Sequence, residues 1–145
     1  MLALLANRRF LALYLSQIAT QVGANALLYA LTIEITARTA GSATTVGAML
    51  WAFLLPTVIA AIPAGVVVDR PDARRILVAS NLLRALFIGG LAALVFASGP
   101  LAAIYLLVLP IAVATALFAP AELAMLPRVV APDELVAANG LFTIT

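Results

Sequence analysis

Charged side chains are few in this sequence, and their spacing limits the chemistry that it can do. The chain has 8 arginines and 6 acidic residues, and five of these lie in the stretch GVVVDRPDARR, residues 65–75. Asp69 follows Gly65 by four residues, so a helix through both would carry them on one face, where the glycine lets a neighbouring helix approach. A helix dipole disfavours an acid at the carboxyl end, so we expect Asp69 to pair with a basic residue. The candidate partners are Arg70, Arg74 and Arg75.

Exposed ion pairs of this kind contribute only about 0 to 1 kcal/mol each. Such weak and reversible pairs suit a device that opens and closes better than a permanent structural link. We therefore interpret the cluster as a candidate conformational latch between two helices. The alternative is a polar loop whose arginines only orient the chain in a membrane. The latch residues are Gly65, Asp69, Arg70, Arg74 and Arg75.

A second group of polar residues lies within apolar stretches. Gln17, Gln21 and Asn25 follow one another at intervals of four residues and share one helical face. Amides facing lipid would be costly, so we expect this face to look into a helix bundle, where it lines a cavity or bonds neighbouring helices. Arg84 shares a helical face with Ser80 and needs a counter-charge or carbonyl partners. The sequence predicts no acid deep in a span that would pair with Arg84.

Several classes of site are excluded by composition. The chain has no histidine or cysteine, so it holds no imidazole or thiolate metal site, and we expect no metal and no cofactor. No carboxylates are paired at helical spacing within an apolar stretch, and no glycine-rich motif suits a phosphate, so we expect no enzyme. The pI of 9.7 is not a sign of nucleic-acid binding, because the arginines lie mostly at the ends of apolar stretches.

The elements that must position these residues are membrane-spanning helices. Hydrophobic residues make up 66% of the chain and charged residues 10%, far from the composition of soluble domains. A helix that crosses the bilayer needs about 20 mostly apolar residues. The sequence predicts an all-α polytopic membrane protein with spans at residues 10–35, 46–68, 76–97 and 101–119. A fifth span begins at about residue 135.

The arginines also predict an orientation. With a cytoplasmic N-terminus, six of them lie inside and only Arg38 lies outside, which agrees with the preference of cytoplasmic loops for positive charge. The fifth apolar stretch is too short to cross a membrane within residues 135–145. We therefore expect the chain to be a fragment whose remaining helices are its partners, together with the lipid bilayer. A short interfacial helix at the C-terminus is the alternative.

The stretch at 65–75 resembles the loop between helices two and three of major facilitator superfamily transporters. The match rests on Gly65, Asp69, Arg70 and the Arg74–Arg75 pair, although the interval before that pair is one residue longer than in the commonest pattern. This longer interval, together with residues 7–27, 76–85 and 118–140, resembles a branch of bacterial exporters that includes enterobactin-exporter-like and macrolide-efflux-like proteins. Exporters of that branch often carry an acid where Ala24 and Asn25 stand here.

This resemblance implies a twelve-helix fold of two six-helix halves in the bacterial inner membrane, a plasma membrane. It implies a secondary active transporter that exports small amphipathic molecules, of drug or siderophore type, by alternating access. The small-molecule substrate would cross a pathway that these spans form only in part.

Two alternatives stay open at this point. The chain could be a self-contained four-helix exporter that works as a dimer, although it lacks the acid in the first span that such a protein needs. It could also be a non-functional membrane remnant.

Overall fold

The computed structural model describes residues 2–68 and 73–144, and these residues are helical apart from short connections. The helices are α1 (Leu2–Ala6), α2 (Arg8–Arg38), α3 (Ala43–Val68), α4 (Ala73–Phe96), α5 (Leu101–Val129) and α6 (Leu135–Ile144), with a 3-10 helix η1 (Pro132–Glu134) before α6. Four of them, α2 to α5, are long and apolar enough to cross a membrane. The predicted all-α architecture with four spans is confirmed.

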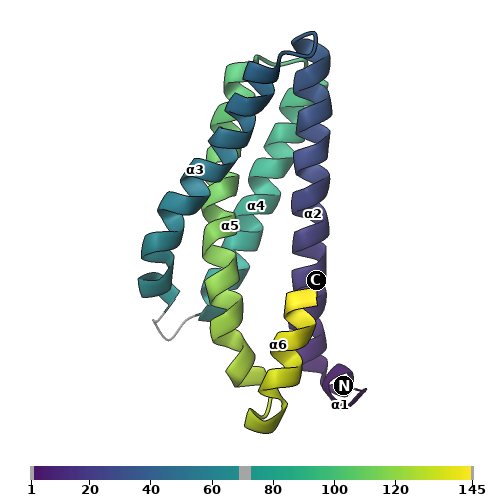
Figure 1. The fold of residues 1–145 in the computed structure, drawn as a ribbon, viewed down its shortest axis with the longest axis vertical. Helices are drawn as coiled ribbons and strands as arrows, with labels where there is room; N and C mark the ends of the chain where they lie inside the picture. The colour runs from purple at the N-terminus through teal and green to yellow at the C-terminus, as the bar shows by residue number, and fades with distance from the viewer. Residues whose placement is uncertain (1, 69–72, 145) are drawn as a thin grey trace.

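Successive long helices run in opposite directions (Figure 1). One end of the bundle, the lower end in this view, holds the N-terminus, the end of α3, the start of α4 and the connection between α5 and α6. The arginines are distributed unequally between the two ends of the bundle. Among the described residues, one arginine, Arg38, belongs to the upper end and Arg84 lies midway along α4. The others belong to the lower end, and they are Arg8, Arg9, Arg74, Arg75 and Arg128.

Helix α2 begins at the lower end because Asn7 caps it. The Asn7 Oδ1 atom accepts hydrogen bonds from the backbone N–H groups of Arg9 and Phe10, which have no partner within the helix. The Asn7 Nδ2 atom donates to the Val129 carbonyl oxygen at 2.8 Å. This second bond ties the start of α2 to the last residue of α5, so one side chain positions both helix ends.

Helix α5 is longer than the sequence predicted. The expected end near residue 119 is wrong, because the helix continues through Pro120 and Pro127 to Val129. Each internal proline removes one backbone donor, but tertiary packing can hold a membrane helix together across this loss. Here the residues after Pro120 are buried against their neighbours, including Ala121 and Leu126. Burial of this face therefore outweighs the local preference of proline for a helix end.

Three apolar clusters hold the bundle together. The first fills the upper half between α2, α3, α4 and α5, with Ile35, Met49 and Ile104 fully buried. The second joins the lower end, where Phe10 of α2 packs against residues of α1, α5 and α6. The ring centroids of Phe10 and Phe142 are 6.0 Å apart, so α6 folds back along the lower part of α2. The third cluster, Leu77, Phe118 and Ala121, joins α4 to α5 between these two.

The upper end is closed by Arg38. Its guanidinium binds Glu34 on the same helix and donates to the carbonyl oxygens of Gly99 and Val95. Val95 lies in the last turn of α4, where its carbonyl oxygen also accepts from the Ser98 N–H group, and Gly99 lies in the connection that follows. Arg38 therefore connects α2 to the turn between α4 and α5.

A methyl group at Gly99 is expected to destabilise this end. An added Cβ would lie 2.3 Å from Leu94 Cδ1 and 3.1 Å from the Leu94 carbonyl oxygen, so Leu94 must leave its position against the first cluster. We expect Gly99→Ala to lower the free energy of unfolding by about 1 to 2 kcal/mol. Gly90→Ala is the matched control, because a Cβ there meets nothing within 4 Å. Denaturant titration in detergent micelles compares the two; equal stabilities would contradict the steric argument.

Candidate functional site

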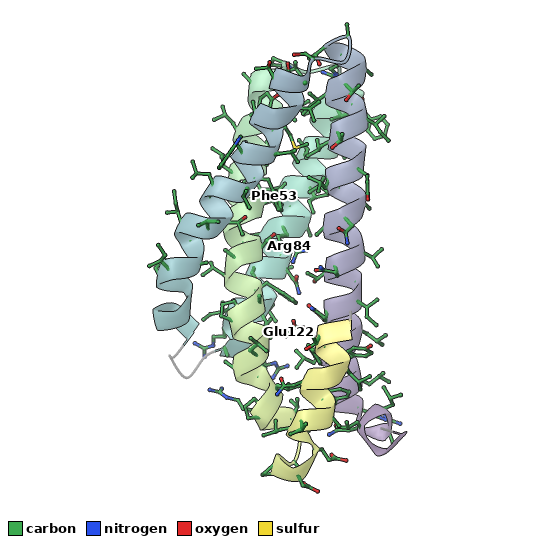
Figure 2. All side chains as sticks on the ribbon, in the orientation of Figure 1. Phe53, Arg84 and Glu122 are labelled. Atoms are coloured by element: carbon green, nitrogen blue, oxygen red, sulfur yellow. The ribbon has the colours of Figure 1, made fainter. Side chains whose placement is uncertain are left out.

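Two charged side chains are buried in the middle of the bundle, on facing helices. Arg84 of α4 is 6% exposed and Glu122 of α5 is 3% exposed. Figure 2 shows both side chains on the side of α4 and α5 that looks toward α2. Charged groups inside membrane helices are expensive, and they usually face a bundle interior or a polar pathway. This pair is therefore the first candidate for a functional site.

Arg84 contacts α2 and α5 but satisfies few of its donors. Its Nη2 atom lies 3.4 Å from the Thr20 carbonyl oxygen of α2, a long hydrogen bond. Its guanidinium carbon lies 5.6 Å from the centre of the Phe118 ring of α5, which is within the range of a cation–π interaction. Among the described residues, the buried Nε and Nη1 atoms have no hydrogen-bond partner. The three N–H groups of these two atoms thus remain available for another group.

Glu122 corrects the expectation that no acid lies deep in the bundle. The sequence placed it at the end of a span because that span was expected to stop at Pro120, whereas α5 carries Glu122 more than one turn past Phe118 with seven helical residues still to come. Its Oε1 atom is buried and has no hydrogen-bond partner in the part of the chain that the structure describes. The spacing of Phe118, Glu122 and Leu126, each four residues apart, is the signal that would have placed this acid on a buried face.

Arg84 contacts α5 one helical turn away from Glu122, but the two charged side chains do not bind each other. Phe118 is the residue that Arg84 contacts, and Glu122 is one helical turn further along α5. Within the part of the chain that the structure describes, an ion pair joins Arg38 to Glu34, and none joins Arg84 to Glu122. A guanidinium with free donors and a carboxyl with a free acceptor are therefore both held in a low-dielectric interior. Such a site can accept the polar groups of a small molecule or bring its two charges together.

The polar residues that the sequence singled out on α2 lie beside this site. Gln17 is half-buried, and Gln21 and Asn25 are exposed on the four-span bundle. None of the three amides forms a hydrogen bond with another described residue. The backbone of Thr20, which accepts from Arg84, lies between Gln17 and Gln21. The structure thus brings Arg84 to the part of α2 that carries two of these amides.

A polar bond that the sequence did not predict also joins α4 to α2. Asn81 Nδ2 donates to Ser16 Oγ at 3.4 Å, one turn below the contact of Arg84 with Thr20. Further along α2, Gly23 has open space where its side chain would be. α2 therefore contacts α4 through polar groups in this region.

The residues of the candidate latch are only partly placed. Gly65 belongs to α3, and Arg74 and Arg75 lie in the first turn of α4, where both are exposed. Asp69 and Arg70 lie outside the described residues. The pairing of Asp69 with an arginine therefore stays a prediction.

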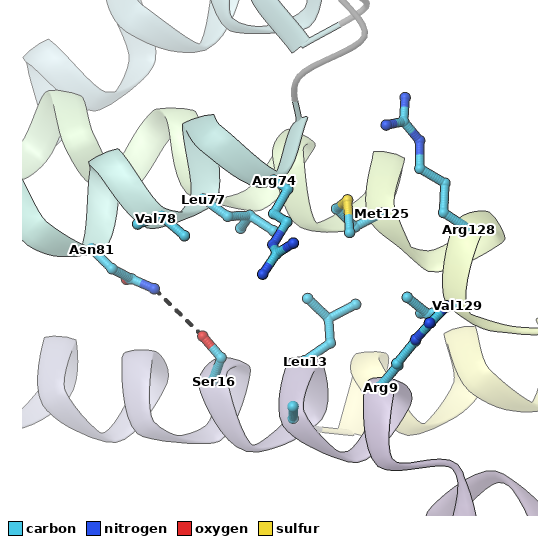
Figure 3. A pocket seen from close by; sticks show the side chains of 11 residues that line it. Arg9, Leu13, Ser16, Arg74, Leu77, Val78, Asn81, Met125, Arg128 and Val129 are labelled. Atoms are coloured by element: carbon cyan, nitrogen blue, oxygen red, sulfur yellow. Dashed lines mark hydrogen bonds between the residues drawn. The ribbon is translucent and has the colours of Figure 1, made fainter.

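A cavity of about 620 Å³ opens at the lower end between α2, α4 and α5. Three arginines line it, one from each helix: Arg9, Arg74 and Arg128. Figure 3 shows Arg74 reaching into the space between the helices and Arg9 rising toward it from α2, while Arg128 stands at the rim. The bond between Asn81 and Ser16 lies at the other end of the cavity. The cavity leads from the arginines toward the polar contacts of α4 with α2.

A bundle of membrane-length helices with unpaired charges in its interior defines a multi-pass membrane protein of the transporter class. The model of the Major Facilitator Superfamily matches residues 13–145 of the chain. The chain therefore belongs to this superfamily of membrane transporters. No curated protein and no solved structure matches it significantly.

Proposed function

We propose that the chain is the N-terminal part of a secondary active transporter that exports small amphipathic molecules by alternating access. The observation that carries this proposal is the buried pair of unpaired charges, Arg84 and Glu122, on membrane-length helices of a transporter superfamily. A transporter keeps such groups, despite their desolvation, because they contact a substrate or change partners as the helices move. The exporter direction and the drug or siderophore type of substrate rest on the resemblance of residues 65–85 and 118–140 to bacterial exporters.

The candidate substrate groups are those that converge on the space between α2, α4 and α5. Arg84 offers donors to an anionic or carbonyl group, and Glu122 offers an acceptor to an amine or hydroxyl. Gln17 and Gln21 add neutral hydrogen-bonding groups from α2. A small molecule with an apolar body and a few polar groups fits this set. We place the protein in the bacterial inner membrane because of its resemblance to bacterial exporters. We place its N-terminus in the cytoplasm because the lower end carries most of the arginines.

We further propose that Gly65, Asp69, Arg70, Arg74 and Arg75 form a conformational latch at the cytoplasmic end. Helix α3 ends at Val68 and α4 begins at Ala73, so Asp69 directly follows one span, and Arg74 and Arg75 begin the next. Weak pairs between these groups would stabilise one arrangement of the two helices and release it readily.

Removing the charge of Asp69 tests both proposals. In cells that express the full gene, we expect Asp69→Asn to lower the efflux of ethidium, an amphipathic dye, by up to about fivefold. A lost exposed ion pair of up to about 1 kcal/mol changes an equilibrium by up to that factor. Asp72→Asn is the matched control in the same connection and is expected to leave efflux near the parental rate. Equal efflux by the parent and Asp69→Asn contradicts the latch. Efflux by the parent that is no higher than in cells without the gene contradicts the exporter.

A further inference from the structure

Three arginines from three helices line the cavity at the lower end. Arg9 lies in the first turn of α2, Arg74 in the first turn of α4 and Arg128 in the last turn of α5. None of the described residues that line the cavity is acidic. Orienting a membrane protein needs arginines at one end, but it does not need three helices to direct them to one cavity. This convergence indicates a binding site for an anion.

The level of the cavity relative to the membrane indicates which kind of anion it binds. Each of the three arginines lies within one residue of the end of a membrane-length helix, which is the level of the lipid headgroups. Deeper in the bundle, the wall includes the apolar side chains of Leu13, Leu77 and Val78, and the polar side chains of Ser16 and Asn81. Val78 is 52% exposed, so the wall continues to the outer surface of the bundle. A molecule with an anionic head and an apolar tail matches this arrangement.

We propose that this cavity holds the headgroup phosphate of an anionic phospholipid, with Arg9 and Arg74 as its ligands and Arg128 at its rim. Within the described residues, neither Arg9 nor Arg74 donates a side-chain hydrogen bond. Arg9 is therefore available to a phosphate, and Arg74 is available when it is not paired in the proposed latch. Guanidinium groups bind phosphate oxygens in bidentate geometry, and basic pockets between membrane helices are suited to anionic headgroups. The acyl chains then leave the cavity over Leu77 and Val78.

Native mass spectrometry of the detergent-purified chain tests this site. The probes are phosphatidylglycerol, which carries a net negative charge, and phosphatidylcholine, which carries none. We expect phosphatidylglycerol to bind at least fivefold more tightly, since each arginine near a headgroup changes binding by about that factor. Arg9→Gln and Arg74→Gln are each expected to weaken phosphatidylglycerol binding about fivefold. Arg74→Lys, which keeps the positive charge, is expected to retain most of the affinity for phosphatidylglycerol.

The chain offers a matched control next to one ligand. Arg8 is exposed and precedes Arg9 on α2, but it does not line the cavity. Arg8→Gln is expected to leave binding unchanged, and an equal loss in Arg8→Gln and Arg9→Gln would show a general attraction to charge and overturn the site. Equal affinity for the two lipids overturns it too.

A competition experiment separates a lipid headgroup from free phosphate. Inorganic phosphate at millimolar concentration is expected not to displace phosphatidylglycerol, because it makes no contact with the apolar wall. Full displacement would show that the cavity takes soluble phosphate and would overturn the lipid assignment. Circular dichroism of each variant confirms that the exposed arginines can be changed without loss of helix.

Discussion

Replacing Arg84 by methionine is expected to stabilise the helix bundle by about 2 kcal/mol, in the range found when buried charges give way to apolar side chains. The guanidinium is buried, and its Nε and Nη1 atoms have no partner to replace the water that they lose. What it gains is one long hydrogen bond to Thr20 and a contact with the Phe118 ring. Methionine has a similar length and keeps the contact with Phe118. The free energy of unfolding, measured by denaturant titration in micelles, checks this result.

Arg84→Lys separates charge from size at the same position. Lysine keeps a positive charge in the same apolar surroundings, so we expect it to give none of the gain. Arg8→Met changes an exposed arginine and is expected to shift stability by no more than about 0.5 kcal/mol. A large loss of stability in Arg84→Met would show instead that the bond to Thr20 holds α2 against α4.

The gross architecture could be predicted from the sequence because it depends on apolar length. Stretches without charge between Arg9 and Glu34, and between Arg38 and Asp69, are long enough for one span each, even though the second contains two prolines. The end of α5 could not be predicted in the same way. Proline usually marks a helix end, and only the packing of Ala121 and Leu126 in three dimensions shows that the helix continues.

Only part of the candidate site could be predicted, because the rest of it also depends on how the helices pack. Arg84 stands out because it is a charge inside an apolar stretch, which the sequence shows directly. Glu122 was missed because its depth depends on where α5 ends. The bond between Asn81 and Ser16 was missed because two polar residues on different spans do not reveal their relative height. Contacts between helices therefore need the structure, whereas the identity of the spans does not.

Buried charges that lower stability need another reason to be present. Natural proteins depart from good packing mainly at functional sites, where activity requires groups that are unfavourable for folding. Arg84 and Glu122 fit this description, since both are buried with unsatisfied atoms in otherwise apolar helices. This argument supports a role in transport more strongly than the exposed amides of α2 do. It also predicts that each charge can be removed without loss of the fold.

Glu122→Leu is accordingly expected to stabilise the bundle by about 2 kcal/mol, the typical penalty for a buried polar atom without a hydrogen bond. The Oε1 atom of Glu122 is such an atom, and its neighbours on α5, Ala121 and Leu126, are apolar. Glu122→Gln is the matched control, because it keeps the shape and a buried polar end and is expected to gain little. Unfolding titrations of the three proteins check this order, and a loss of stability in Glu122→Leu would show that the carboxyl has a partner.

Combining Arg84→Met with Glu122→Leu measures how strongly the two charges interact. Each single variant removes one unfavourable burial but also removes the attraction that the remaining charge feels. Opposite charges about 8 Å apart attract by about 2 kcal/mol at an effective dielectric constant of about 20. Both single variants lose this attraction, so the sum of the two single gains subtracts it twice, whereas the double variant loses it once. The gain in stability of the double variant is therefore expected to exceed the sum of the single gains. Strict additivity would show that Arg84 and Glu122 act independently, and that each charge is kept for its own contact with a substrate.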